Sequence, residues 1–151
     1  MFRGVNTINL DSKGRLAIPT RYREQLVRSC EGQMVVTVDR DGCLLLYPLP
    51  EWEEIERKLA RLSSFNKQTR RLQRLLIGHA TECEMDASGR ILLSQPLRDF
   101  AGLEKAAVLI GQSNKFEIWS ESNWNQRRQQ WIDGDGEDDG ELPADLESLS
   151  L

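Results

Sequence analysis

Two short segments of this chain combine the same polar residues at the same spacing. Asp11, Gly14 and Arg15 form an Asp-x-x-Gly-Arg sequence, and the same pattern recurs in the second half of the chain from Asp86 to Arg90. The aspartate can accept hydrogen bonds from backbone N–H groups that follow it, and glycine tolerates positive φ, so each segment predicts a turn. An arginine held at such a turn can donate two hydrogen bonds to one guanine, or bind a phosphate. The pattern therefore favours a binding surface over a catalytic centre.

The similarity between the two segments extends along the chain. Arg23 and Arg98 are separated by the same offset as Arg15 and Arg90, and a further set keeps a nearly equal offset: Leu46, Tyr47 and Trp52 match Ile118, Trp119 and Trp124. Shared offsets over several elements indicate a duplicated module. Each repeat spans only about 50 residues, a length at which a single core is marginal. We therefore expect the repeats to share one core, or to borrow one from a neighbouring chain, and the matched tryptophans to belong to that core.

Charge is segregated along the 151 residues, although the formal net charge is only −4. Residues 133–151 hold eight acidic side chains and no basic one, whereas residues 1–132 hold 20 basic and 16 acidic side chains. The first 28 residues hold six basic side chains and two acidic ones. A basic N-terminal region fits a polyanionic partner, and the acidic, glycine-rich tail predicts disorder.

The pattern of apolar residues and turn formers predicts the same element order twice. In the first half we expect strands at 4–10 and 15–18, a helix at 20–28, strands at 34–38 and 43–47, and helices at about 48–62 and 67–77. In the second half we expect strands at 80–85 and 91–93, a helix at 96–101, strands at 106–110 and 116–119 around a turn at 112–114, and a helix from Ser120 to about Trp131.

The element order predicts an α+β fold made of two β-rich modules packed with helices. We place the first module at 5–52, linking helices at 53–80, the second module at 81–124, and the helix end with the acidic tail at 125–151.

The basic residues around the first turn are the candidate contacts to DNA. A two-stranded ribbon fits the major groove of B-DNA, and an arginine at its tip can reach guanine O6 and N7. Lys13, Arg15, Arg3 and Arg21 all lie in one N-terminal stretch. The alternative is a solvated hairpin in which Arg15 merely pairs with Asp11.

The chain resembles the MraZ family in both Asp-x-x-Gly-Arg turns, in the Leu-Ala-Ile-Pro sequence after the first turn and in Arg-Tyr-Arg-Glu-Gln-Leu after that. The resemblance covers roughly residues 1–125. It implies two swapped-hairpin modules of the SpoVT-AbrB type and closed rings of about eight or more subunits. It also implies a transcriptional regulator that binds repeated boxes upstream of the division and cell-wall gene cluster, its own promoter included.

By the same resemblance, Arg15 is the arginine that faces DNA, with Lys13 beside it and Arg3 nearby. The second turn carries Ser88 in place of Lys13 and follows two glutamates. Arg90 is therefore a candidate either for DNA contact or for a role in the fold or the ring. Direct repeats in DNA suit such a ring, because several identical turns on one scaffold multiply the affinity.

Other site types receive little support. His79 and Cys83 stand four residues apart without a second pair of ligands, and no third group orients them for catalysis. We therefore expect no enzymatic activity, no cofactor and no metal. Three widely spaced cysteines, no signal peptide and no long apolar run predict a soluble, cytoplasmic protein without a membrane segment. The DNA binding that the resemblance implies would associate it with the nucleoid.

Two features allow other interpretations. The acidic tail could wrap a basic toxin, as in an AbrB-like antitoxin, or it could aid solubility, repel DNA, or compete for the basic patch. A strip formed by Arg70, Arg71 and Arg74 could contact DNA, but a solvated face, or charge pairing at the ring interface with Glu53, Glu54 or Glu56, is favoured.

Overall fold

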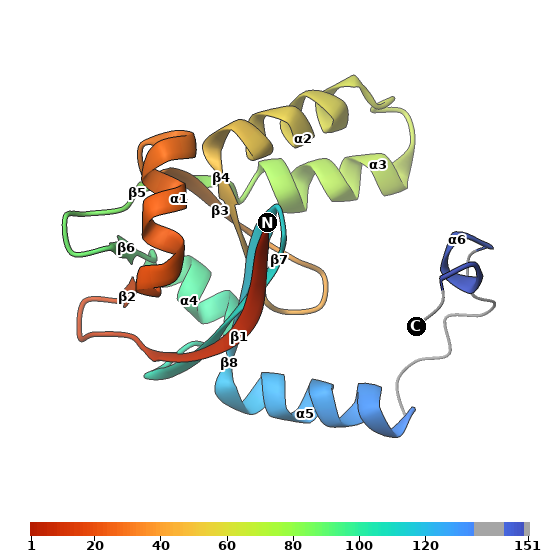
Figure 1. The fold of residues 1–151 in the computed structure, drawn as a ribbon. Coiled ribbons are helices and arrows are strands. Elements are labelled where there is room, and N and C mark those ends of the chain that lie inside the picture. Colours follow the sequence, from red (N-terminus) through yellow and green to blue (C-terminus); the bar gives the residue numbers. More distant parts are fainter. Residues whose placement is uncertain (135–143, 150–151) are drawn as a thin grey trace.

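A six-stranded antiparallel sheet lies between two layers of helices (Figure 1). The computed structural model describes residues 1–134 and 144–149. The strands are β1 (Phe2–Asn9), β3 (Gln33–Val38), β4 (Leu44–Pro48), β5 (Thr81–Glu84), β7 (Ala106–Ser113) and β8 (Lys115–Ser120). Their order across the sheet is β1-β7-β8-β4-β3-β5. The predicted α+β class is therefore confirmed.

The two halves of the sequence interleave within this sheet. β1 from the first half pairs with β7 from the second along its whole length, and β5 from the second half pairs with β3 from the first. At the centre, β4 and β8 join the halves, with Leu44 opposite Ile118. Neither half could keep its edge strands paired without the other, which explains why repeats of about 50 residues are stable together.

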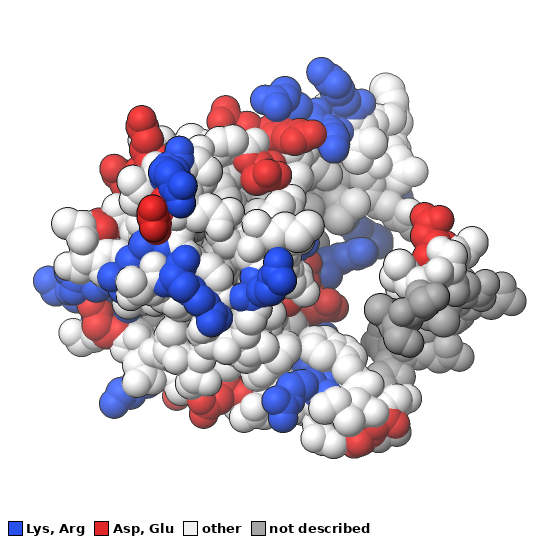
Figure 2. Space-filling view, in the orientation of Figure 1, with Lys and Arg blue, Asp and Glu red and all other residues white. Residues whose placement is uncertain are grey.

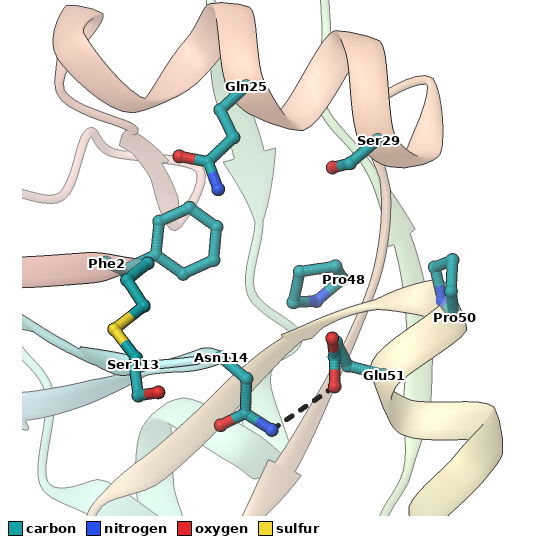
Figure 3. Close-up of a pocket in the computed structure, with 9 residues that line it drawn as sticks. Phe2, Gln25, Ser29, Pro48, Pro50, Glu51, Ser113 and Asn114 are labelled. Atoms are coloured by element: carbon teal, nitrogen blue, oxygen red, sulfur yellow. Dashed lines mark hydrogen bonds between the residues drawn. The ribbon is translucent and has the colours of Figure 1, made fainter.

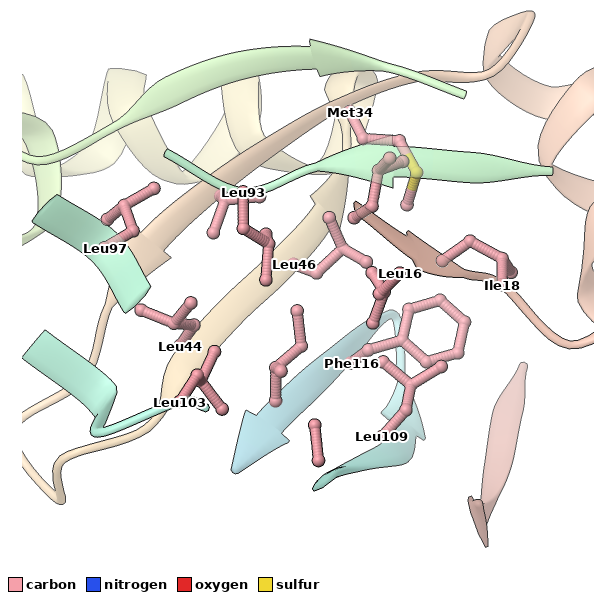
Figure 4. Close-up of a cluster of buried hydrophobic side chains, with 14 of the residues drawn as sticks. Leu16, Ile18, Met34, Leu44, Leu46, Leu93, Leu97, Leu103, Leu109 and Phe116 are labelled. Carbon is pink, nitrogen blue, oxygen red and sulfur yellow. The ribbon is translucent and has the colours of Figure 1, made fainter. Parts of the chain in front are cut away.

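One face of the sheet carries the larger apolar core (Figure 4). Over it lie α1 (Thr20–Cys30), α4 (Gln95–Ala101) and a two-stranded ribbon of β2 (Arg15–Ala17) and β6 (Arg90–Leu92). Both halves supply its fully buried side chains, which include Leu16, Ile18, Leu46, Leu93, Leu109 and Phe116. The shared core that the sequence predicts is thus present.

The opposite face is covered by α2 (Leu49–Arg61), by a π-helical turn η1 (Gln73–Ile77) that continues α3 (Lys67–Leu72), and by α5 (Glu121–Asp133). Trp52 and Trp119 are buried there, and Trp124 packs against the same cluster. The prediction that the matched tryptophans are core residues is confirmed. Successive strand residues point to opposite faces, so Val35 joins this cluster while Met34 and Val36 join the other.

Most predicted elements are present, in the predicted order. Ser120 caps α5, because its Oγ accepts the backbone N–H of Asn123 at 3.2 Å. The helix predicted at 67–77 is α-helical only to Leu72 and continues as the π-turn η1. The turn predicted at 112–114 is tighter, because β7 runs on to Ser113 and Gln112 pairs with Lys115.

One prediction about the turns is wrong. An arginine at the tip of a two-stranded ribbon, as expected from the sequence, requires the strand after each turn to return along the strand before it, as a hairpin. Instead β2 pairs with β6, its counterpart in the other half, and not with β1. The apolar Leu16 and Ile91 favour this arrangement, because pairing β2 with β6 buries both against the shared core.

The C-terminal segment is described only in part. A short helix α6 (Ala144–Glu147), which the sequence did not predict, lies within it. The predicted disordered tail falls mainly on residues 135–143, outside the described part of the chain. Among the described residues, no helix is both long and apolar enough to cross a membrane.

Candidate nucleic-acid interface

Hydrogen bonds to a single carboxylate organise the first turn. Asp11 Oδ1 accepts the backbone N–H groups of Lys13 and Arg15, each at 2.9 Å. Asp11 Oδ2 accepts Nε of Arg15 at 2.8 Å, so the same carboxylate also holds the guanidinium. The alternative in which Arg15 pairs with Asp11 is therefore observed. It engages only Nε, however, and leaves Nη1 and Nη2 without a hydrogen bond among the described residues.

The second turn reproduces this geometry atom for atom. Asp86 Oδ1 accepts the backbone N–H groups of Ser88 and Arg90, each at 2.9 Å, and Oδ2 accepts Arg90 Nε at 3.1 Å. The exchange of Lys13 for Ser88 leaves the turn unchanged, because position three contributes only its backbone N–H. Both arginines are thus held in the same way.

The turn carboxylates stay ionised. Hydrogen bonds from the Arg15 backbone and side chain, with that from the Lys13 backbone, lower the pKa of Asp11 to about 2. The backbone N–H of Arg90 is the main cause of a lowered pKa at Asp86. Each carboxylate is therefore negative at any pH near neutrality, and its hold on the arginine persists there.

Pairing of β2 with β6 places both arginines on one outward face. Arg15 lies opposite Leu92 and Ala17 lies opposite Arg90, while Leu16 and Ile91 between them point into the core. Diagonal neighbours on an antiparallel pair are about 7–8 Å apart. The outer face of the ribbon therefore presents two arginines on one diagonal and two apolar side chains on the other, with Leu92 57% exposed.

The turn of each half is braced by an arginine of the other half. Gly14 has φ +86°, and a Cβ added there would lie 2.5 Å from Nε and Cζ of Arg98. Gly89 has φ +75°, and the side chain of Arg23 packs on it even more closely. Each bracing arginine is fixed in turn, because Arg23 Nε donates to the Ile18 carbonyl at 2.7 Å and Arg98 Nε donates to the Leu93 carbonyl at 3.1 Å.

Backbone bonds complete the reciprocal arrangement. The N–H of Ile18 donates to the Gly89 carbonyl at 2.8 Å, and the N–H of Leu93 donates to the Gly14 carbonyl at 3.0 Å. Each glycine therefore joins the two halves through its carbonyl and leaves room for an arginine above it. This requirement explains why the turn motif contains glycine, since any Cβ would displace the brace.

The structure separates the other candidate residues from the ribbon face. Arg3 lies on β1 at the end away from the turn; eight residues of extended strand span about 26 Å. Arg21 lies in the first turn of α1, where its Nη2 donates to Asn6 Oδ1 at 2.9 Å and its Cζ lies 4.8 Å from the centroid of the Tyr22 ring. Lys13 is exposed in the first turn beside Arg15. Of the five residues predicted to contact DNA, only Lys13, Arg15 and Arg90 are thus grouped at the ribbon.

Basic side chains gather in two places on the face shown in Figure 2. One group covers α1 and the neighbouring ribbon end, and the other covers the α2–α3 hairpin.

Sequence reasoning missed the bracing role of Arg23 and Arg98, although the offset that they share with Arg15 and Arg90 was the available signal. It also missed Leu92, whose exposure depends on the pairing of β2 with β6.

Features that could support catalysis are weak among the described residues. A cavity of about 230 Å³ lies between the N-terminal strand, α1 and the start of α2 (Figure 3). Of the side chains lining it, only Glu51 is charged, and its carboxylate accepts Asn114 Nδ2 at 3.3 Å. Cys83 lies on β5 rather than on a helix with His79, and burial raises the pKa of its thiol to about 12. Among residues 1–134 and 144–149, no three histidine, cysteine, aspartate or glutamate side chains lie close enough together to hold a metal ion.

Comparison with known proteins matches this duplicated architecture to one family. The family model described as "MraZ protein, putative antitoxin-like" matches the chain twice, over residues 1–75 and 76–139. The chain belongs to the MraZ family. The two matches follow the internal repeat that the offsets and the interleaved sheet display.

Relatives support the same assignment along the full length. A protein of Thioalkalivibrio sulfidiphilus is 60% identical over 151 residues, covering all of both chains. One of Methylococcus capsulatus is 65% identical over 133 residues, 88% of each chain, and one of Escherichia coli is 57% identical over 152 residues. Each is named "Transcriptional regulator MraZ". MraZ proteins are a family of regulators and not enzymes, which confirms the prediction of no enzymatic activity.

Proposed function

We propose that this chain is a sequence-specific DNA-binding transcriptional regulator that reads base edges through the outer face of the β2–β6 ribbon. A two-stranded ribbon fits the major groove of B-DNA, and arginine pairs with guanine O6 and N7 through two N–H groups. Because Asp11 and Asp86 engage Nε, the Nη1 and Nη2 ends of Arg15 and Arg90 are those that would meet guanine. The proposal rests on this orientation of the two arginine side chains on the ribbon.

The ion pair within each turn favours base reading over phosphate binding. A carboxylate beside each arginine cancels most of its long-range attraction for phosphate, which weakens a purely electrostatic contact. It also fixes the side-chain rotamer before binding, which lowers the entropic cost of an oriented contact. The exposed Leu92 adds an apolar surface that could meet a thymine methyl group. Lys13, Arg21 and Arg3 would then contact phosphates, each at its own distance from the ribbon.

The assembly that we propose is a closed ring of about eight or more copies, built from modules of the swapped-hairpin type. A single ribbon offers only two arginines, so one copy alone should bind weakly. Several ribbons on one scaffold, meeting direct repeats spaced by about one helical turn, raise affinity through effective concentration. The repeated boxes would lie upstream of the division and cell-wall gene cluster, including the protein's own promoter, and binding there would place the protein on the nucleoid.

The test compares Arg15→Ala and Arg90→Ala with Arg28→Ala. Arg28 is an exposed arginine of α1 whose one ion pair among the described residues is with Glu24. Gel-shift titration on the promoter fragment, with the number of boxes varied, gives affinity for each. A bidentate arginine–guanine contact contributes about 1–3 kcal/mol, so each ribbon variant should lose about tenfold or more while Arg28→Ala changes little. Unchanged affinity in Arg15→Ala would refute the proposed contact, and affinity indifferent to box number would refute the ring.

A further inference from the structure

The tip of the α2–α3 hairpin is the most basic part of the described chain. Residues 57–74 contain seven arginines and lysines and no acidic side chain. Among the described residues, its one ion pair is that of Lys58 with Glu54, at 3.6 Å. Phe65 at the tip is 94% exposed and Leu62 is 46% exposed. Within the described part of this one chain, Arg70, Arg71 and Arg74 form no ion pair with a glutamate, which agrees with the predicted solvated face; pairing at a ring interface stays a prediction.

The tip is an ordered surface. Asn66 caps α3, with its Oδ1 accepting the backbone N–H of Gln68 at 2.8 Å. Arg70 Nη1 donates to the Ser64 carbonyl at 2.8 Å, and Gln73 Nε2 donates to the Leu59 carbonyl at 2.9 Å, which ties the two helices together. These bonds order the backbone of the tip and the side chain of Arg70. The tip therefore presents an exposed phenylalanine among six cationic side chains that form no ion pair with the described residues, and this combination suits an acidic partner with some apolar side chains.

We propose that the acidic C-terminal segment, residues 133–151, docks on this hairpin tip within the same chain. The segment contains eight acidic and no basic side chains, so the two regions nearly balance in charge. It also contains leucines, of which Leu146 and Leu149 are exposed. These supply the apolar side chains that could cover Phe65 and Leu62. Attachment to the same chain gives the segment an effective concentration in the millimolar range.

The position of α5 makes the hairpin, and not the ribbon, the accessible basic region. α5 and α2 pack on the same face of the sheet, whereas the ribbon covers the opposite face. Ten residues separate Asp133 from α6, and a segment of that length can extend to about 35 Å. In addition, the ribbon arginines have carboxylate partners within their own turns, whereas the arginines of the hairpin tip have none among residues 1–134 and 144–149.

Docking would divide the two basic regions between two partners. The ribbon remains open to DNA, while the hairpin is covered and cannot bind a polyanion non-specifically. This arrangement differs from competition of the tail for the DNA-binding face. It is independent of the sequence read by the ribbon, so its test needs no DNA.

Carbodiimide cross-linking tests the contact, because it joins a carboxylate to a lysine amine only when they touch. Lys58 and Lys67 report on the hairpin, and Lys13 reports on the ribbon. In about 50 mM salt, peptide mapping of the full chain should find the tail joined to Lys58 or Lys67 and not to Lys13. At about 0.5 M salt, where the screening length falls below about 5 Å, the yield should fall at least about threefold.

Matched variants separate a specific contact from general attraction. The hairpin variant replaces three exposed arginines by glutamine, Arg57, Arg61 and Arg71, and keeps both reporter lysines. The control makes the same charge change elsewhere, at Arg28, Lys105 and Arg128. Only the hairpin variant should lose about threefold or more of the tail adducts, while far-ultraviolet circular dichroism stays unchanged in both.

Four results would overturn the proposal. They are adducts on Lys13 instead of the hairpin, no tail adducts at either place, equal losses in the two variants, and adducts that join ¹⁵N-labelled to unlabelled chains after co-refolding. The first would place the tail on the ribbon, and the last would place it on a neighbouring copy. If the tail adducts are absent and the hairpin variant alone loses non-specific DNA affinity, the hairpin's partner is nucleic acid.

Discussion

Gly14→Ala tests whether the two halves hold each other's turns. Gly14 has φ +86°, and its added Cβ would meet the Arg98 guanidinium at 2.5 Å. A residue with a Cβ in the left-handed region costs about 1–2 kcal/mol. Arg98 must also move and lose its hydrogen bond to the Leu93 carbonyl, which contributes about 1 kcal/mol. We therefore expect a loss of about 2–3 kcal/mol in the free energy of unfolding.

Gly42→Ala is the matched control. Gly42 also ends a turn and has φ +90°, but a Cβ added there meets nothing within 4 Å. It should therefore show the backbone cost alone, about 1–2 kcal/mol, and the same reduction in unfolded-state entropy that any Gly→Ala change brings. The difference between the two variants in the free energy of unfolding isolates the contribution of the Arg98 brace. Gly42→Ala should be more stable than Gly14→Ala by about 1 kcal/mol.

Urea denaturation of both variants at one protein concentration measures this difference, since assembly makes stability depend on concentration. A difference of about 1 kcal/mol corresponds to roughly 2–4 °C in Tm for a chain of this size. Gly14→Ala should also weaken DNA binding, whereas Gly42→Ala should not. Equal destabilisation by the two substitutions would show that Arg98 does not brace the first turn.

Three further predictions concern the turns and the core. Asp11→Asn raises the net charge by one, yet it should weaken specific DNA binding severalfold because Arg15 loses its orienting carboxylate; stronger binding in gel-shift titration would instead indicate simple phosphate attraction. The lowered pKa values of Asp11 and Asp86 mean that both turns contribute stability above the unfolded-state pKa near 4. Each turn loses this stability only as pH falls through its lowered folded-state pKa, which is about 2 for Asp11. The turn contribution to stability and DNA affinity should therefore be flat between pH 5.5 and pH 8 in buffer titrations, and a transition in this window that disappears in Asp11→Asn would contradict the assignment. Leu16→Ala removes a fully buried side chain of the ribbon and should lower the free energy of unfolding, measured by urea denaturation, by about 2–5 kcal/mol. A loss below about 1 kcal/mol would show that the core face of the ribbon does not anchor it.

The sequence by itself determined the local structure and the existence of the duplication. Asp-x-x-Gly-Arg dictates its own turn, because the carboxylate, the backbone N–H groups and the guanidinium that meet there all lie between Asp11 and Arg15. Buried runs such as 34–38 predict strands for the same local reason. The matched offsets predict two equivalent halves and a shared core.

Which strands pair was decided only by the tertiary structure. The sequence predicted a hairpin at each turn, but the strand after the turn pairs with its counterpart in the other half of the chain. Local propensity cannot distinguish the two pairings, because both satisfy the same backbone groups. They differ in what they bury, since only the pairing of β2 with β6 puts Leu16 and Ile91 into the core while Arg15 and Arg90 face outward. For the same reason the brace of Gly14 by Arg98 could not be read from the sequence: it joins residues from different halves of the chain, and burial of the common core alone brings them together.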